Sequence, residues 1–350
     1  MKYWEGNAYL NWVVIIPYCA MDKHRIEQKR DVINLIRTWF TSQEFFELET
    51  PILVPSPGME VHLHGFKTTY IDPHDKAWEY YLPTSPEFAI KKALGAGFGK
   101  VFEIARVFRN QGELGPQHHP EFNMLEWYRP GNYLDIMDDV EALLQFISHN
   151  FKLEGRPDHF SWDDGITRLS VADCFQQYAQ LDLQRGIEDQ EYWFESAKKV
   201  LGENIPDDDT FEDIFFRIWM KLIEPNLGKY KPEIVFDYPA SMAALSKLKA
   251  SNPTWAERFE LYIQGVEIGN AFSELTDSEE QRVRFEAANK ERERLGYPPH
   301  PVDEDLIRAI GKMGNTGGIA IGIERLLMVL TDETEIHKFF LQPLESMNLT

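Results

Sequence analysis

The segments VFEIARVFRN (residues 101–110) and FNMLEWYR (residues 122–129) decide how this chain folds. Both are short runs rich in β-branched and aromatic residues, which is typical of β-strands. The loop QGELGPQHHPE (residues 111–121) joins them and carries glycine and proline, which favour turns. The pattern predicts an antiparallel pair of strands connected by a long loop.

One face of this predicted pair carries chemically useful side chains. Strand alternation places Phe122, Met124, Glu126 and Tyr128 on the same side, so an aromatic ring, a carboxylate and a phenol line up. Arg109 ends the first strand, where a guanidinium group is suited to binding a phosphate. An ordinary amphipathic hairpin with a surface arginine is the alternative that these residues leave open.

A second pair of strands is predicted in FELYIQGVEIGNAFSEL (residues 259–275), with Gln264 and Gly265 as a two-residue turn. In this register Ile263 lies opposite Val266, Tyr262 opposite Glu267, and Glu260 opposite Gly269. Glu260 and Glu267 then share a face as diagonal neighbours. Two carboxylates this close repel each other unless a cation lies between them, and Mg²⁺ held also by phosphates would satisfy both.

The end of this segment predicts a local irregularity. Asn270, Phe272 and Glu274 alternate onto one face, which strict alternation places opposite to Glu267. If all of them line one pocket, a β-bulge near Gly269 must redirect the strand. A solvent-facing hairpin with scattered acidic residues is the alternative.

The third segment is GGIAIGIERLL (residues 317–327). Its isoleucines face one side and Gly318, Ala320 and Gly322 face the other, so a flat ligand can approach the backbone closely. Arg325 follows at the predicted change from strand to helix, within reach of a terminal phosphate. Tight packing of the sheet against a helix is the commoner explanation for such glycines.

The remaining chain organises around these segments. Residues 23–46 have a helical pattern, and the mostly helical, acidic stretch at about 131–230 is predicted to be an insertion in a single domain spanning 23–350. Residues 1–22 are predicted to be an extension, in which Trp12–Ile16 forms a strand or packing arm. That apolar run is far too short to cross a bilayer, so no membrane attachment is expected.

Charge and cysteine content limit the partners. The 350 residues have a formal net charge of −21, which disfavours a nucleic-acid backbone as the main partner and suits a basic protein. Cys19 and Cys174 are two isolated thiols that form neither a disulfide framework nor a metal site. This cysteine content is typical of a cytoplasmic protein.

Together the three segments resemble the signature motifs of class II aminoacyl-tRNA synthetases. FFELETPIL (45–53) is similar to motif 1, FRNQG through HPEF (108–122) to motif 2, and GIAIGIER (318–325) to motif 3. The resemblance covers nearly the whole chain from about Lys23 and implies an α+β fold, with a mainly antiparallel sheet flanked by helices. Motif 1 builds a dimer interface in that family, so the resemblance also implies a homodimer.

Within class II, TSPEFAIKKAL (84–94) and the three segments are most similar to lysyl-tRNA synthetases. Those enzymes carry an anticodon-binding barrel before the catalytic core, whereas little precedes the core here. That difference, and Ala320 at a position where the synthetases have glycine, resembles the paralogous family that modifies elongation factor P. The resemblance implies ATP-dependent formation of a lysine or (R)-β-lysine adenylate and transfer to a lysine side chain of elongation factor P, with tRNA an unlikely acceptor.

The resemblance also assigns roles residue by residue. Arg109 and Arg325 are expected to be catalytic, binding the α- and γ-phosphates, and Phe122 to stack on adenine. Glu260 and Glu267 are expected to contact Mg²⁺. The other expected ATP contacts are Asn110, Gln111, His118, His119, Glu260, Leu261 and Gly322. The expected amino-acid pocket consists of Ser85, Pro86, Glu87, Glu126, Tyr128, Glu267, Asn270, Glu274 and Ala320.

Three residues depart from the family pattern. Gln111 replaces the usual glutamate, His119 follows His118 where asparagine is usual, and Glu324 replaces aspartate before Arg325. The motif 2 loop is also one residue longer. The first two changes bear on nucleotide contacts or loop closure, and none removes an essential arginine.

Two other functions stay open at this point. One is a truncated lysyl-tRNA synthetase-like ligase with a different acceptor, such as tRNA or a small molecule. The other is a non-catalytic regulatory paralogue, against which the intact Arg109, Arg325, Glu260 and Glu267 argue.

Overall fold

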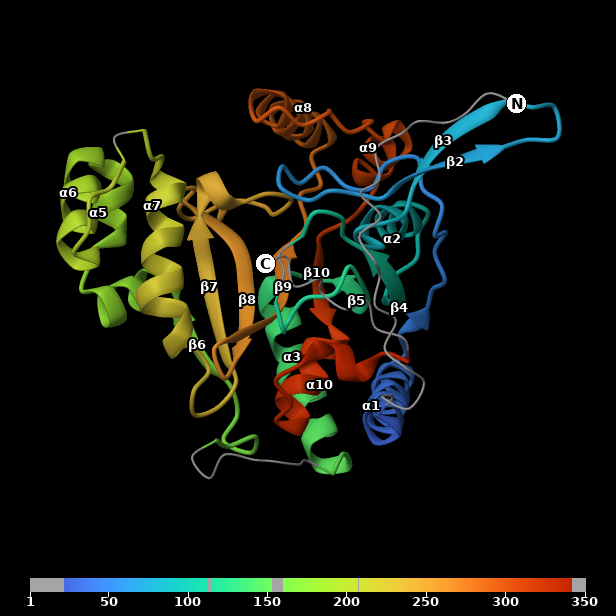
Figure 1. Ribbon diagram of the computed structural model, residues 1–350, viewed down its shortest axis with the longest axis horizontal. Coiled ribbons are helices and arrows are strands. Elements are labelled where there is room, and N and C mark those ends of the chain that lie inside the picture. The colour runs from blue at the N-terminus through green and yellow to red at the C-terminus, as the bar shows by residue number, and fades with distance from the viewer. Residues whose placement is uncertain (1–21, 113–114, 153–159, 207, 342–350) are drawn as a thin grey trace, which may run out of the picture.

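A mostly antiparallel eight-stranded sheet forms the centre of the molecule, in the strand order β1-β4-β5-β10-β9-β8-β7-β6 (Figure 1). The structure is a computed structural model that describes residues 22–112, 115–152, 160–206 and 208–341. The strands are β1 (Phe46–Glu47), β4 (Val101–Phe108), β5 (Glu121–Pro130), β6 (Thr167–Ser170), β7 (Glu233–Pro239), β8 (Trp255–Ile263), β9 (Val266–Ser273) and β10 (Thr316–Gly322). Within the described residues the parallel pairs are β1 with β4 and β6 with β7, at the two edges. The predicted extension at 1–22, with Trp12–Ile16, lies outside the described residues except for Asp22.

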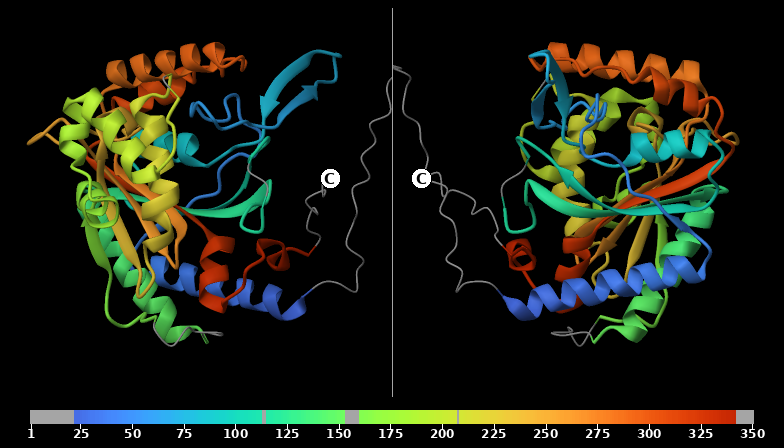
Figure 2. Two further views of the ribbon diagram at one scale, coloured as in Figure 1. Left: turned by 60° about the vertical axis from the view of Figure 1, so that its left-hand side comes forward. Right: turned by 90° about the vertical axis from the view of Figure 1, so that its right-hand side faces the viewer.

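Helices cover both faces of the sheet, so the α+β prediction is confirmed (Figure 2). On one face lie α1 (Lys23–Ser42), α3 (Tyr133–Asn150) and α10 (Ile323–Thr331), and on the other lie α2 (Glu87–Gly95), α8 (Ser278–Arg294) and α9 (Glu304–Ile310). The main core lies under α1, α3 and α10, where Leu125 and Trp127 of β5 meet Ile319 and Ile321 of β10. Because alternate residues face opposite sides, the same strands turn their polar residues toward the other face.

Between α3 and β7 the chain builds a second apolar core at the β6–β7 edge of the sheet. Its helices are α4 (Val171–Cys174), α5 (Leu183–Glu188), α6 (Gln190–Leu201) and α7 (Phe211–Ile218), with π-helical turns at Phe175–Ala179 and Trp219–Ile223. The predicted insertion at about 131–230 also includes α3, but α3 packs in the main core. Its apolar stripe resembles that of any amphipathic helix, so sequence alone does not tell which core it covers.

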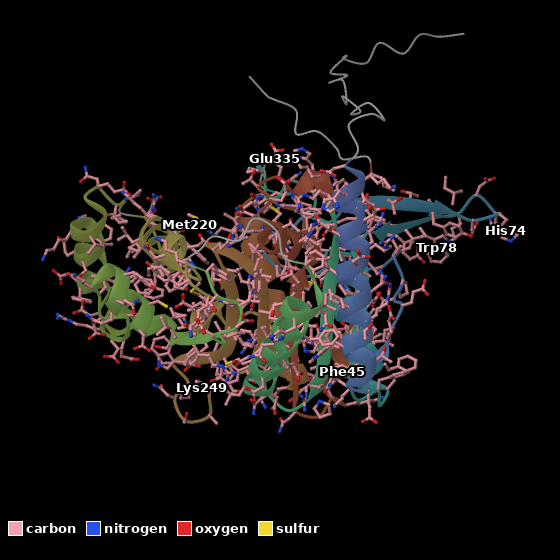
Figure 3. All side chains as sticks on the ribbon, turned by 90° about the horizontal axis from the view of Figure 1, so that it is seen from below. Phe45, His74, Trp78, Met220, Lys249 and Glu335 are labelled. Carbon is pink, nitrogen blue, oxygen red and sulfur yellow. The ribbon has the colours of Figure 1, made fainter. Side chains whose placement is uncertain are left out.

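The hairpin of β2 (Lys67–Ile71) and β3 (Ala77–Tyr81) extends away from the body of the molecule, as His74 and Trp78 show (Figure 3). Short 3₁₀ turns at Glu224–Asn226, Ala240–Met242 and Ile336–Phe339 complete the described elements. Among the described helices, none combines the length and apolar character that crossing a membrane requires.

A buried ion pair joins three elements beneath the sheet. Lys29 of α1 places its Nζ 2.5 Å from Oε1 of Glu324, at the start of α10, and the other carboxylate oxygen of Glu324 accepts a hydrogen bond from the backbone N–H of Asn123 in β5, at 2.9 Å. Glu324 is 1% exposed. The glutamate that departs from the family pattern therefore ties α1, β5 and α10 together.

Replacing Lys29 tests this contact. Lys29→Met leaves the Glu324 carboxylate buried without its counter-charge, and we expect a loss of about 3 kcal/mol in the free energy of unfolding, measured by urea titration. Lys23→Met is the matched control on the same helix, because Lys23 is 88% exposed and 3.7 Å from Glu27. The control should change stability by less than about 0.5 kcal/mol. Equal effects of the two variants would contradict a structural role for the pair.

Candidate active site

A single rung of polar residues crosses five strands on the face opposite the main core. Glu103 of β4 lies opposite Glu126 of β5, which lies opposite Ala320 of β10. Ala320 in turn lies opposite Asn270 of β9, and Asn270 opposite Glu260 of β8. Directly opposed residues of antiparallel strands share a face. The register therefore brings residues from three separate sequence segments into one row.

The predicted β-bulge is present in β9 and changes which side chains face the cleft. Leu261 pairs with Gly269 and Tyr262 with Glu267, so Ile268 is the extra residue of a β-bulge. Glu267 consequently shares a face with Tyr262 and with the polar rung. The prediction that Glu260 opposes Gly269 was wrong by one residue, because that register assumed a regular ladder through the bulge. The predicted two-residue turn is confirmed, since Ile263 pairs with Val266 and both Gln264 (φ 53°) and Gly265 (φ 74°) have positive φ.

Two of the predicted pocket carboxylates contact one buried lysine, and a third lies near them. Nζ of Lys91 in α2 lies 2.5 Å from Oε1 of Glu87, one turn earlier, and 2.6 Å from Oε2 of Glu274, which follows β9. Burial lowers the pKa of Lys91, but the charges of Glu274 and Glu87 outweigh it and the net pKa is raised. Lys91 therefore stays protonated between the two carboxylates.

Glu126 is the third carboxylate and is 1% exposed. Its Oε2 accepts a hydrogen bond from the Tyr128 hydroxyl at 2.9 Å. Burial, with a further contribution from the charge of Glu87, raises its pKa well above the usual range. Burial also raises the pKa of Glu274, to about 7, although Lys91 acts to lower it. A pocket with this much buried negative charge favours a positively charged ligand.

Gly318 leaves the space in which Tyr128 and Glu274 meet. A Cβ at this position would lie 2.3 Å from Cε1 of Tyr128 and 2.7 Å from Oε1 of Glu274. Ala320, two residues on, is tolerated because it packs beside the small group of Ala105, Val107 and Met124. The small residues of β10 therefore form the floor of the cleft.

Arg109 and Phe122 lie beside this floor. The Arg109 guanidinium is 5.3 Å from the centroid of the Phe122 ring. Burial lowers its pKa, while the charges of Glu60 and Glu267 act in the opposite direction. Across the described chain, Nε of Arg109 is buried with no hydrogen-bond partner, and no carboxylate forms an ion pair with this side chain. A guanidinium with a buried, unpaired Nε and no ion-pair partner in the described chain indicates a site for an anion.

Arg325 lies near the N-terminal end of α10, against the motif 2 loop. Its Nη2 is 2.8 Å from Nε2 of His118, its Nη1 donates to the backbone oxygen of Glu267 at 3.1 Å, and its guanidinium is 3.9 Å from the Glu267 carboxylate. Gln111 begins the loop with a left-handed backbone (φ 52°) after Asn110, whose backbone N–H donates to His64 O. The structure thus brings Arg325, His118 and Glu267 together.

Some predicted contacts lie elsewhere in this structure. The His119 ring stacks on Phe340 at 4.1 Å, so a nucleotide contact by His119 requires the loop to move. The Leu261 side chain is buried in the main core on the far face, which leaves only its backbone for a ligand. Ser85 and Pro86 line a surface pocket with the proline-rich segment 51–57, at the outer side of the start of α2. Gly322 caps the N-terminus of α10 beside Arg325.

Glu260 is held by three donors. The hydroxyls of Tyr238 and Tyr262 donate to its Oε2 at 2.6 and 2.5 Å, and Nη2 of Arg258 donates to its Oε1 at 2.5 Å. Arg258 also donates to Asn270 at 3.2 Å, and Trp219 of the second core donates to Tyr262 at 3.2 Å. The second core therefore orients Glu260 through the hydrogen bonds from Trp219 to Tyr262 and from Tyr262 to Glu260.

The two glutamates predicted to hold Mg²⁺ can be tested against this geometry. A carboxylate offers about four acceptor positions, and Glu260 has one left on Oε1. The pKa of Glu267 is raised to about 7 by its enclosure in the cleft and by the charge of Glu260, although 39% of the side chain stays open. Glu267, which is partly accessible, and Glu260, which has one acceptor position left, are together suited to a cation that phosphates also bind. The described residues hold no cluster of three or more potential ligands that could bind a metal ion without such help.

Sequence reasoning missed three charged residues at the site. Lys91 follows Glu87 by four positions, a spacing that is typical of an ion pair on the surface of a helix. Arg258 lies two positions before Glu260, and its place in a strand gives no sign of a role at the site. Glu60 lies in a loop whose carbonyls at 61 and 63 accept hydrogen bonds from Arg292, at 2.7 and 3.0 Å. Enclosure by the surrounding cleft and the charge of Glu87 raise the pKa of Glu60, although its side chain stays exposed to solvent, and Arg109 acts to lower it. Its place in the cleft depends on the distant α8, which no local pattern indicates.

Gly318→Ala tests the floor of the cleft. The added methyl group overlaps the Tyr128 ring and Glu274, so we expect a loss of about 1–3 kcal/mol in the free energy of unfolding, measured by urea titration. Gly99→Ala is the control, because a Cβ there meets nothing within 4 Å. The free energy of unfolding of the control should be within about 1 kcal/mol of that of the parent protein. A neutral Gly318→Ala would show that the Tyr128–Glu274 contact is looser than described.

Comparison with known proteins places this arrangement in a family. A family model described as tRNA synthetases class II (D, K and N) matches residues 19–346. A protein of Avibacterium paragallinarum named elongation factor P–(R)-β-lysine ligase is 40% identical over 306 residues, covering 85% of this chain and 88% of its own length. A protein of Salmonella paratyphi A with the same name is 35% identical over 302 residues, with the same two coverages. Another of that name, from Salmonella arizonae, is 36% identical over 302 residues. The arrangement of motifs on the sheet and these similarities agree, and the chain belongs to the class II tRNA synthetase family of the D, K and N group.

Proposed function

We propose that this protein is an ATP-dependent ligase that activates (R)-β-lysine, or lysine, as an aminoacyl-adenylate and transfers it to a lysine side chain of elongation factor P. The observation that carries the activation step is the Nε of Arg109, which is buried and has no hydrogen-bond partner among the described residues, on a sheet face that also carries Glu126. The names of the relatives support the substrate and the acceptor.

In the first step a carboxylate oxygen of the amino acid attacks the α-phosphorus of ATP, and the bond to pyrophosphate breaks. Arg109 binds the phosphate oxygens on which negative charge grows, and Phe122 stacks on the base. Glu87, Glu126 and Glu274 hold the ammonium groups and thereby align the carboxylate. Alignment and charge stabilisation are sufficient, so no covalent enzyme intermediate is required.

In the second step the ε-amine of the acceptor lysine attacks the acyl carbon of the adenylate. A C–N bond forms, the C–O bond to AMP breaks, and the amine releases a proton to solvent. The acidic chain, with its net charge of −21, attracts a basic acceptor more readily than a nucleic acid. We therefore favour a protein acceptor over tRNA.

Mg²⁺, when bound with ATP, neutralises phosphate charge. We propose that Glu267 and the remaining acceptor position of Glu260 hold it. Tyr238, Tyr262 and Arg258 keep Glu260 in place for this role.

We further propose a homodimer built on motif 1, working in the cytoplasm. At the β1 edge of the sheet Phe46 is 58% exposed, and its ring packs at a tilt against Phe98, which is 44% exposed, with the ring centroids 5.6 Å apart. Ile52 and Leu53, on the segment that follows, are also exposed. Such neighbouring apolar side chains are typical of a surface that another chain covers.

Pyrophosphate exchange tests the activation step. We expect exchange with (R)-β-lysine or α-lysine and none without an amino acid, followed by labelling of elongation factor P. Arg109→Ala should lower the exchange rate by about 10²–10³-fold, because one charged donor to the reacting phosphate is lost. Arg106→Ala on the same strand is the control, since Arg106 is 55% exposed and pairs with Glu121. Its rate should stay within about twofold of the parent rate.

Each contrary outcome removes a different part of the proposal. Absence of exchange with every amino acid would refute the enzyme and favour a regulatory paralogue. Exchange followed by labelling of tRNA, with elongation factor P unlabelled, would refute the proposed acceptor alone.

The raised pKa of Glu267 predicts a pH dependence of nucleotide binding. Because its pKa lies at about 7, Glu267 gains a proton as the pH falls through 7 and then offers less charge to a cation. Affinity for ATP with Mg²⁺, measured by calorimetry, should therefore rise from about pH 6 to about pH 8. Glu267→Gln should bind more weakly with little pH dependence, whereas the exposed Glu279→Gln should behave like the parent protein. A parent protein whose affinity does not change over this range would contradict the assignment.

A further inference from the structure

A fully buried lysine is unusual, and Lys91 has no assigned role in the proposed reaction. Its side chain is 1% exposed, and its ammonium group lies between Glu87 and Glu274 rather than at the surface. The two carboxylates come from α2 and from the end of β9, which the sequence separates widely. One ammonium group therefore links two walls of the predicted amino-acid pocket.

The contact leaves one oxygen of Glu274 uncommitted. Oε2 of Glu274 makes the ion pair with Lys91, while Oε1 has no hydrogen-bond partner in the described part of the chain. Glu274 is 0% exposed. Oε1 lies above Gly318 beside the Tyr128 ring, since a Cβ on Gly318 would be 2.7 Å from Oε1 and 2.3 Å from Cε1 of Tyr128. A buried carboxylate oxygen without a donor indicates that a donor is supplied by a ligand.

The charge balance of the pocket points the same way. Glu87, Glu126 and Glu274, when ionised, face one ammonium group, which leaves two formal negative charges. A lysine-like substrate brings two ammonium groups, and its carboxylate is directed to Arg109. Without Lys91, three buried carboxylates would crowd together and take up protons before any substrate arrives.

We propose that Lys91 is a positioning residue for amino-acid binding: its ammonium group pairs with Glu87 and with Glu274 Oε2 and holds both side chains in place, so that Glu274 Oε1 is available to an ammonium group of the substrate. The inference rests on the proposed function, because it assigns the substrate ammonium to these carboxylates. It goes beyond the proposed function because it attributes the selection of a diamino acid to Lys91, a residue of the protein itself.

The groups that face Lys91 determine what its removal does. Through space its charge acts on Glu87, Glu274 and Glu60, and the first two also act on Glu126 and Tyr128. Glu274 and Glu60 lose a charge that lowers their pKa values when Lys91 is replaced, so both pKa values rise further, and a protonated carboxylate binds ammonium poorly.

Steady-state pyrophosphate exchange by the full-length Lys91→Met variant tests this role. We expect the KM for the amino acid to rise at least about tenfold at pH 7, while the KM for ATP stays within about twofold. The defect should shrink as the pH rises from about 6.5 to about 8.5, because the carboxylates ionise again. Lys91→Arg, which keeps the charge, should recover part of the affinity and lose the pH dependence.

Lys92→Met is the matched control, since Lys92 is the next residue of α2, is 34% exposed, and pairs with Asp303 instead of with Glu87 or Glu274. It should leave the KM for the amino acid unchanged. If Lys91 only stabilised the fold, Lys91→Met and Lys91→Arg would lose similar amounts of unfolding free energy. The KM values for the amino acid and for ATP would then both change, without a dependence on pH. This outcome would overturn the inference. An unchanged KM for the amino acid in Lys91→Met would overturn it as well. Failure of the parent protein to exchange pyrophosphate would refute the proposed function itself, which keeps the two failures distinct.

Discussion

The burial of negative charge on one face of the central sheet is the constraint on which the structure depends. Glu103, Glu126 and Glu260 lie in one rung of an otherwise apolar sheet, and Glu274 lies beside it. Carboxylates removed from water are costly unless donors or cations satisfy them. Thr50 supplies both a backbone and a hydroxyl donor to Glu103, Tyr128 serves Glu126, and two tyrosines with Arg258 serve Glu260. In the described chain Glu103 and Glu274 each keep an oxygen that no donor reaches, and of the two only Glu274 lies in the predicted amino-acid pocket, where we propose that a substrate ammonium group binds.

The two cores of the protein serve this rung from opposite sides. The main core fixes the strands through α1, α3 and α10, and the Lys29–Glu324 pair fastens α1 and α10 to β5. The second core extends through Trp219 and Tyr262 to Glu260. Above the sheet, α8 holds the loop that carries Glu60 through Arg292. The second core and α8 therefore each make contacts that place a charged side chain at the cleft, and such preorganisation is what adenylate formation requires.

The sequence predicts the fold and the faces of the strands well, because strand alternation is a local property. Glu126 and Tyr128 share a face as predicted, and the bulge was placed within one residue from the conflict between Glu267 and Asn270. What sequence reasoning missed depends on long-range contacts. The local pattern around Lys91 is typical of a residue on the surface of a helix. Its burial depends on a contact with Glu274, which lies 183 positions later in the sequence. Similarly, Leu261 was predicted beside the nucleotide but its side chain packs in the main core, because a resemblance assigns a position without saying whether the backbone or the side chain acts.

Selection of the substrate by charge is the central claim, and calorimetric titration of the unmodified protein with lysine and with norleucine tests it most directly. Norleucine has the same carbon chain and the same α-amino acid group but lacks the terminal ammonium group. The account predicts measurable binding of lysine and no detectable binding of norleucine, because a buried carboxylate would remain unpaired. Equal affinity for the two amino acids would contradict it, since the pocket would then recognise shape without using its buried carboxylates.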